Sequence, residues 1–341
     1  MLNDGTAEDN VSNHEAREPA PAAVNLYPPK PQLEETRSNI WLRSVISLGL
    51  YLVIGYYFFS ANWALLLVLT GIVIFHELGH FTAMKLFRYD ELGIFFIPLL
   101  GAYASGTKRQ ISQRQSAIIL LAGPMPGIIA GIILLLVLRH QPVSFTYHQL
   151  AFLQSTGALL IFLNVLNLLP IYPLDGGQLL NRLFLDDSKI VAKTFVILSA
   201  AAMAFFAIRI EFYPLLVFPA MMVYRLVAEA RSDRLTAKVE AVGVNLEKTY
   251  DEITDEDYWK IRDVLIASNH SSVRNVRPGV PYEYAVNEDK VVSAVENLLQ
   301  RSIIQDLSGA GKVLIVLVWL AGFSVPFLMD LDLPFFSGQG R

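Results

Sequence analysis

The sequence has no cysteine among its 341 residues. Disulfides, thiolate zinc sites and cysteine nucleophiles are therefore excluded, and any metal must be held by histidine, aspartate or glutamate. Charge is also scarce, at 17% of residues against roughly 25% in a soluble globular chain. The net charge of -4 and the lack of a Lys/Arg stripe give no sign of a nucleic-acid partner.

Hydrophobic residues are abundant instead, at 53% of the chain. They lie in separate runs of about 20 residues, the length that crosses a bilayer. This pattern predicts an all-α polytopic membrane protein with six or seven transmembrane helices, for which the lipid bilayer is the main solvent. The predicted spans are Ile40–Phe59, Trp63–Leu86, Ser116–Leu138, Leu150–Leu169, Ile190–Ile208, Phe212–Val227 and Val313–Leu328, the last being short for a span.

Composition divides the chain into four parts. Residues 1–39 are polar and rich in Pro and Glu, and predict a disordered tail. Residues 40–227 form the membrane core. Residues 228–312 predict a small cytosolic helical domain, with one helix starting at Thr254 and a second carrying Val291, Val295 and Leu298. Residues 313–341 hold the last run and a tail.

Basic residues set the expected orientation. They gather before the first span, between the second and third, after the fourth and after the sixth. Placing these groups in the cytosol satisfies the positive-inside rule without conflict. In that arrangement the candidate chemical site lies toward the cytosolic side of a cell or organelle membrane.

The second span ends in His76-Glu77-Leu78-Gly79-His80. On a helix the two histidines share a face, about 6 Å apart along the axis, so both can reach one zinc ion. Glu77 is offset by one residue and is suited to accept a proton from a metal-bound water. The alternative is a surface helix with two solvated histidines. Ionisable residues in a span cost about 2.5–3.5 kcal/mol each, which disfavours that alternative.

A catalytic zinc site usually needs a third protein ligand. Asp175 is the candidate, in the Pro- and Gly-rich segment that follows the fourth span, from Asn167 to Gly177. Broken backbone at membrane depth is tolerated where protein or a wet cavity covers it, and an aspartate held there favours a cation. The alternative is that Asp175 caps the short helix that begins at Gly176.

Together these two motifs resemble the site-2 protease family of intramembrane zinc metalloproteases, over about Trp63 to Leu180. The resemblance implies that His76, His80 and Asp175 bind zinc and that Glu77 is the catalytic base. It also implies a role for Asn167 in catalysis or substrate binding.

Two further features bear on the resemblance. The segment Ile94–Ala104 resembles the family's re-entrant β-hairpin, which would place Phe96, Pro98 and Gly101 against a substrate paired with its edge. A plain buried loop is the alternative for this segment. No PDZ-like insertion is visible between the third and fourth spans, where Arg139–Gln149 is short.

The resulting expectation is a zinc metalloendopeptidase that cuts transmembrane protein substrates within or near the bilayer. Two other functions stay open: a catalytically silent homologue that binds membrane proteins, and a metal-ion transporter. Intact His76, Glu77, His80 and Asp175 disfavour the silent binder, and their gathering in two motifs disfavours the transporter. A homo-oligomer is left open by the sequence.

Overall fold

The computed structural model describes residues 26–32, 39–59, 62–98, 101–108, 111–140, 145–185, 188–270, 273, 278–286, 288–299 and 303–329. Residues 1–25 and 33–38 of the predicted tail, and residues 330–341 at the other end, lie outside this described part.

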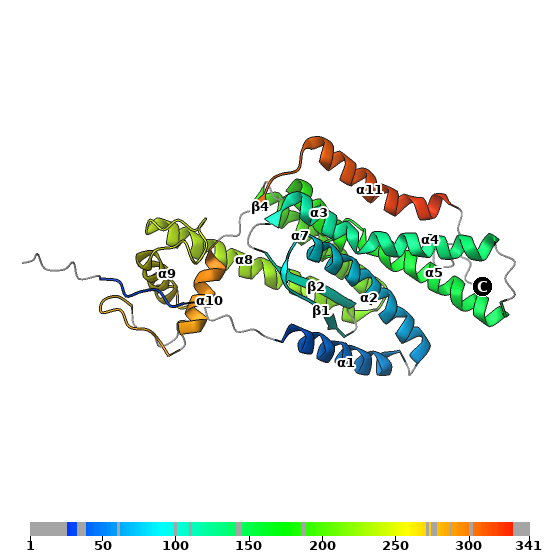
Figure 1. Ribbon diagram of the computed structural model, residues 1–341, viewed down its shortest axis with the longest axis horizontal. Coiled ribbons are helices and arrows are strands. Elements are labelled where there is room, and N and C mark those ends of the chain that lie inside the picture. The colour runs from blue at the N-terminus through cyan, green and yellow to red at the C-terminus, as the bar shows by residue number, and fades with distance from the viewer. Residues whose placement is uncertain are drawn as a thin grey trace, which may run out of the picture.

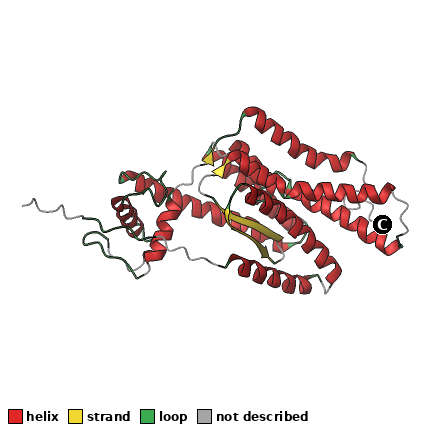
Figure 2. Cartoon of the chain, in the orientation of Figure 1, coloured by secondary structure: helices red, strands yellow, loops and turns green. Residues whose placement is uncertain are grey.

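Helices dominate the molecule, and two short sheets complete it (Figures 1 and 2). Among the described residues, seven helical segments are long and apolar enough to cross a membrane. Many of their large apolar side chains are exposed, as lipid contact requires. The chain is therefore an integral, multi-pass membrane protein. The seven segments are α1 (Ile40–Phe58), α2 (Trp63–Leu86), α3 with α4 (Gln113–Ala122 and Pro124–His140), α5 (Tyr147–Asn167), α7 (Lys189–Arg209), α8 (Val217–Ala241) with the 3-10 turn Tyr213–Leu216 before it, and α11 (Gly309–Leu328).

Helix ends follow local capping chemistry. The side chains of Asn39 and Asn62 accept backbone hydrogen bonds at the starts of α1 and α2, and Thr146 forms a capping box with Gln149 at the start of α5. Ser308 caps α11, so the short final run is a helix of spanning length. One boundary differs from the prediction, because α8 continues past Val227 to Ala241 as a polar extension of the sixth span.

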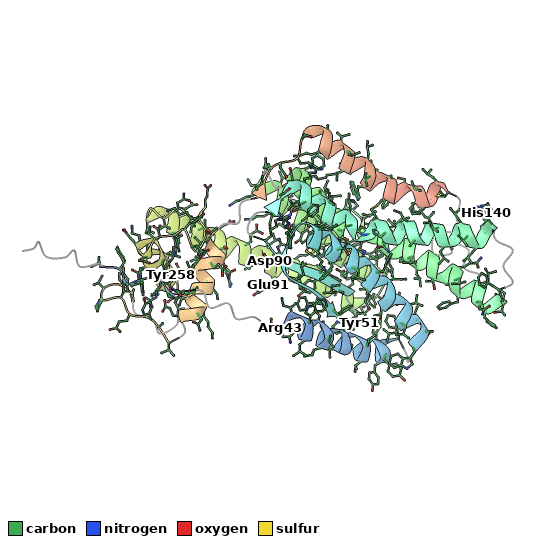
Figure 3. The ribbon with its side chains drawn as sticks, viewed as in Figure 1. Arg43, Tyr51, Asp90, Glu91, His140 and Tyr258 are labelled. Carbon is green, nitrogen blue, oxygen red and sulfur yellow. The ribbon has the colours of Figure 1, made fainter. Side chains whose placement is uncertain are left out.

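The predicted hairpin is present and is longer than expected. Strand β1 (Asp90–Ile97) pairs antiparallel with β2 (Gly101–Thr107). Helix α1 covers the outer edge of β1, where the Phe96 N–H donates to Ser47 Oγ at 3.1 Å. The Phe96 ring packs against Tyr51 of α1 (labelled in Figure 3) with centroids 5.8 Å apart. In the described part of the chain the opposite edge, on β2, has no partner strand.

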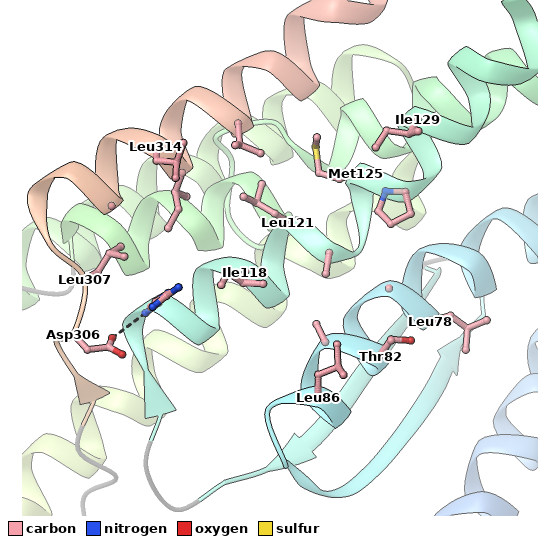
Figure 4. A pocket seen from close by; sticks show the side chains of 18 of the residues that line it. Leu78, Thr82, Leu86, Ile118, Leu121, Met125, Ile129, Asp306, Leu307 and Leu314 are labelled. Carbon is pink, nitrogen blue, oxygen red and sulfur yellow. Dashed lines mark hydrogen bonds between the residues drawn. The ribbon is translucent and has the colours of Figure 1, made fainter.

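The core of the membrane region lies between α3, α4, α5 and the segment after α5. Helices α4 and α5 pack closely because Gly131 faces Gly157 and Ile161. Helix α11 lies along this core, and Trp319 donates its Nε1–H to the Leu168 carbonyl at 2.8 Å. An apolar cavity of about 930 Å³ opens between α2, α3, α4 and α11 (Figure 4).

The predicted helices of the small domain form, as α9 (Asp255–Ala267) and α10 (Glu288–Leu298). Thr254 makes a capping box with Asp257 as the sequence indicates. Tyr258, Trp259 and Leu265 of α9 are fully buried against Val291 and Val295 of α10 (Figure 3 labels Tyr258). The domain lies at one end of the molecule, next to the extension of α8 (Figure 1).

The remaining elements are two short strands and two short helical segments. Strands β3 (Ile111–Ser112) and β4 (Ile303–Ile304) pair in parallel. Helix α6 (Asp175–Leu180) is followed by the π-helical turn Asn181–Leu185.

The expectation of a disordered tail is wrong for residues 26–32. This segment lies against the small domain, where the Lys30 backbone N–H donates to Asp255 Oδ1 at 2.8 Å. The segment has few aliphatic residues to bury, so its composition resembles that of a tail. Its partners are aromatic side chains more than 200 positions away, which composition does not reveal.

Candidate metal centre

Helix α2 delivers two imidazoles to one point. His76 and His80 are both buried, and their Nε2 atoms lie 3.1 Å apart. Asp175 is brought to the same point by the segment after α5. Its Oδ2 atom lies 3.1 Å from His76 Nε2 and 3.3 Å from His80 Nε2. The three residues that the sequence singled out as ligands therefore form one cluster of converging donor atoms.

A second set of contacts fixes the imidazole rings. His76 Nδ1 lies 2.8 Å from Asn164 Oδ1, and His80 Nδ1 lies 2.8 Å from the Ile119 carbonyl oxygen. Both oxygens can only accept a hydrogen bond, so each imidazole carries its hydrogen on Nδ1. The lone pair on Nε2 then points toward the cluster. The sequence motifs did not identify Asn164 as a site residue. The feature that could have identified it is a polar amide within an apolar span, one turn before Asn167.

Two glycines make room for the His80 ring and for the Asn164 amide. A Cβ on Gly123 would lie 2.2 Å from His80 Nε2, and one on Gly127 would lie 2.2 Å from Asn164 Nδ2. Gly79 allows the backbones of α2 and α3 to touch, since its Cβ would lie 1.9 Å from the Ala122 carbonyl oxygen. The small residues around Gly123 therefore shape the metal centre as well as the helix packing.

The segment that carries Asp175 is held by its backbone. Leu174, not Asp175, is the N-cap residue of α6, and no side chain caps that helix, so the capping role considered for Asp175 is not observed. A Cβ on Gly176 would lie 2.0 Å from the Leu168 carbonyl oxygen, and one on Gly177 would lie 2.3 Å from the Ile171 carbonyl carbon. The Gly-Gly pair thus lets α6 pack directly onto the segment before it and sets the position of Asp175.

The donor atoms fit a bound metal ion. Zinc with tetrahedral ligands at about 2.0–2.1 Å has ligand atoms about 3.3–3.4 Å apart, close to the three separations within the cluster. Asp175 Oδ2 is buried and accepts no hydrogen bond. Such an orphaned carboxylate oxygen is costly unless a cation completes it. Two neutral imidazoles and one carboxylate form a donor set that zinc accepts.

Glu77 lies beside the cluster and faces the hairpin. The side chain is buried, and the backbone N–H of Ala104 in β2 lies within hydrogen-bonding reach of it. The apolar cavity is on another face of α2. Leu78, Thr82 and Leu86 are among the residues that line it, and at about 100° per residue Glu77 points about 140° away from the centre of their face. Glu77 therefore faces the hairpin and not the cavity.

The other predicted site residues lie around this centre without joining the cluster. Asn167 is half-buried, and its Nδ2 donates to the Leu163 carbonyl at 3.2 Å. Phe96 packs under α1, away from the edge of β2. Pro98 is half-buried in the turn, and Gly101, at φ +113°, has open space where a Cβ would be. The structure thus places Phe96 in the packing of the hairpin, whereas Pro98 and Gly101 lie near its tip.

Several known proteins are similar to parts of this chain. Peptidase family M50 matches residues 64–149. A zinc metalloprotease of Methanocaldococcus jannaschii is 30% identical over 140 residues, covering 39% of this chain and 40% of that protein. Stage IV sporulation protein FB of Bacillus subtilis is 28% identical over 158 residues, covering 43% and 50% respectively. A solved site-2 protease from M. jannaschii aligns with 54% of this chain and 85% of that chain, at 22% identity and a TM-score of 0.38.

The chain covers no more than 50% of the length of the two curated relatives. The region matched by the family nevertheless contains the whole His76–His80 segment. The sequence matches thus confirm the resemblance to the site-2 proteases, with residues 64–149 matching peptidase family M50.

Proposed function

We propose that this chain is a zinc metalloendopeptidase that hydrolyses peptide bonds of transmembrane protein substrates within or beside the bilayer. The observation that carries the proposal is the triangle of His76 Nε2, His80 Nε2 and Asp175 Oδ2, with sides of 3.1 to 3.3 Å. Zinc bound there would polarise the scissile carbonyl and make a bound water acidic enough to be activated near neutral pH.

Glu77 is the proposed general base. It sits one residue from His76 on the hairpin side of α2, where it can take a proton from the attacking water and pass it to the leaving amine. Asn167 is proposed to bind the substrate carbonyl. One of its two amide hydrogens is used by Leu163, which leaves the second for a substrate. Asn164 and the Ile119 carbonyl keep the two imidazoles in the orientation that hydrolysis needs.

The free edge of β2 is the proposed docking strand for the substrate. The Phe96 N–H points to α1 and not to β2. In an antiparallel pair such positions alternate, so the backbone groups point outward from the hairpin in two of the opposed pairs, Phe96 with Ala102 and Ile94 with Ala104. Ala102 therefore presents its backbone N–H and C=O, and Ala104 its C=O, along the edge of β2 that has no partner strand. The Ala104 N–H reaches Glu77, so a substrate strand on this edge would pass the proposed base.

The proposed orientation puts the metal centre toward the cytosol. The N-terminal ends of α1 and α3, the C-terminal end of α2 and the small domain would all lie on that side, with the basic residues that flank them. Protease accessibility of the small domain in sealed, right-side-out vesicles tests this orientation. Protection in sealed vesicles that is lost on lysis is the expected result, and cleavage in intact vesicles would reverse the topology.

The activity is tested by cleavage of a model single-span substrate in vesicles. Glu77→Gln should lower the cleavage rate by at least about 100-fold while zinc content is kept. Glu211→Gln, at an exposed turn residue between α7 and α8, is the matched control and should cleave at the parent rate. A Glu77→Gln protein as active as the parent would rule out the assignment. Zinc flux into vesicles by the parent, without cleavage, would favour a transporter instead.

A further inference from the structure

Residues 26–32 lie in a groove of the small domain that is lined by aromatic side chains. Three of them donate hydrogen bonds to carbonyl oxygens of the segment. Trp259 Nε1 donates to Pro28 at 2.7 Å, and the hydroxyls of Tyr284 and Tyr250 donate to Pro29 at 2.5 Å and Pro31 at 2.8 Å. A fourth ring, Tyr282, stacks on Tyr27 with centroids 5.5 Å apart.

A lysine between two of these prolines has a socket of its own. Lys30 Nζ donates to the carbonyl oxygens of Tyr250, Asp251 and Ile253 at 2.6, 3.1 and 2.7 Å. An ammonium has three N–H donors, so all of them are used. The ammonium also lies 5.2 Å from the centre of the Tyr250 ring. A planar guanidinium would not match three converging carbonyls, so the socket distinguishes lysine from arginine.

The bound segment, Tyr27-Pro-Pro-Lys-Pro31, is suited to this kind of binding. Its prolines fix φ near −65° and keep the residues before them extended. Such a segment has little conformational freedom left to lose on binding. Its carbonyl groups form no hydrogen bonds within the segment and are open to donors from outside. Aromatic-lined grooves that donate hydrogen bonds to proline carbonyls recognise peptides in this way.

The groove is held in shape from within the small domain. The Arg262 guanidinium lies 4.7 Å from the centre of the Trp259 ring. Asp263 accepts from the Tyr282 hydroxyl at 3.0 Å and from the Gly279 N–H at 3.2 Å. These contacts lie within the domain and do not involve residues 26–32. The walls of the groove therefore have support that does not depend on its occupant.

We propose that this groove is a recognition site for an extended, proline-rich segment with a lysine between prolines, and that the chain's own residues 27–31 are its occupant. Occupation ties the polypeptide just before α1 to the small domain between α8 and α11. Because occupant and groove belong to one chain, the segment competes at an effective concentration of about 1 mM or more, and a peptide added from outside binds poorly until the segment is removed.

The test uses a fluorescent peptide of residues 24–34 and measures its anisotropy with two purified proteins, the full chain and a variant that lacks residues 1–32. The variant should bind the peptide saturably, and the full chain should bind at least about tenfold more weakly. Peptides with Lys30→Met or Lys30→Arg should bind the variant at least about tenfold more weakly than the parent peptide. A variant that fails to bind, or equal binding of all three peptides, would overturn the proposal.

Two further measurements guard against misfolding and nonspecific binding. If the deletion loosens the small domain, the parent peptide should restore the protection of α9 and α10 from proteolysis, and failure to restore it would overturn the proposal. In the deletion variant, Tyr284→Phe should weaken peptide binding about fivefold, because one hydroxyl donor is lost. Tyr213→Phe, the same change at an exposed tyrosine outside the groove, should leave binding unchanged.

Discussion

Nδ1 of His76 lies 2.8 Å from Oδ1 of Asn164, which is 88 positions further along the chain. The amide orientation is supported by its other end, since Asn164 Nδ2 donates to the Leu160 carbonyl at 2.7 Å. The oxygen therefore faces the imidazole and accepts its proton. This one contact sets the tautomer and the ring angle of a proposed metal ligand from a different helix.

Replacing Asn164 should weaken zinc binding before it affects the fold. In Asn164→Leu, His76 loses the acceptor that fixes its ring, and affinity should fall by about 10–100-fold. Competition against a chelator of known affinity measures the change. Asn167→Leu is the matched control one turn later on α5. It should keep the parent affinity and lose cleavage activity, so equal loss of zinc in both variants would contradict the separate roles given to the two asparagines.

Gly123 is expected to tolerate no side chain. In Gly123→Ala, the new methyl group would meet His80 Nε2 at 2.2 Å, so the ring must move and the metal centre should lose zinc and activity. Gly71→Ala, also in α2, is the matched control, because its methyl group would have no contact within 4 Å. Alanine is also preferred over glycine in a helix by roughly 1 kcal/mol. The measurements are the zinc content and the thermal stability of both variants. Parent zinc content in Gly123→Ala would contradict the geometry.

The sequence predicted the parts of this centre that depend on local spacing. The placement of His76 and His80 on one face follows from the helical repeat, and the seven apolar runs follow from bilayer thickness. The choice between Asn164 and Asn167 does not. The two lie three positions apart on one apolar helix, about 60° apart around its axis, and only the rotation of α5 against α2 decides which one meets His76.

Non-local contacts account for the other differences. Residues 26–32 resemble a tail until Trp259, Tyr250 and Tyr284 are placed beside them. Trp319 lies on the last apolar run, which is short for a span, and it donates a hydrogen bond to the carbonyl at the end of α5. Neither relationship has a signature at fixed spacing, because each depends on segments brought together by the fold.

The small domain should depend on one buried ion pair. Arg262 Nε donates to Glu288 Oε1 at 3.0 Å, and both residues are buried. Glu288→Ala would leave the guanidinium without its partner and should lower the free energy of unfolding of the domain by about 3–5 kcal/mol. Denaturant dependence of amide exchange in α9 and α10 measures this. Glu256→Ala, which removes the exposed pair with Lys260, should change it by no more than about 0.5 kcal/mol.

Alkaline pH should loosen the same domain. Burial and the hydrogen bond to Asp263 raise the pKa of Tyr282 to about 12, against about 10 in an unfolded chain. The stability that this tyrosine contributes is thus complete below about pH 10 and is lost as the pH rises toward about 12. Thermal unfolding of the domain across this range should show a falling midpoint, and a smaller fall in Tyr282→Phe. The same slope in both proteins would contradict the assignment.

The most direct test of the central claim is the zinc content of the detergent-purified chain, measured beside His76→Ala, His80→Ala and Asp175→Ala variants that still fold. His148→Ala, at an exposed histidine near the start of α5, serves as the control. The metal centre predicts about one zinc ion per chain in the parent and the control, and a lost or much weakened ion in each of the three variants. A folded parent that binds no zinc, or an Asp175→Ala variant that binds it as tightly as the parent, would contradict the account.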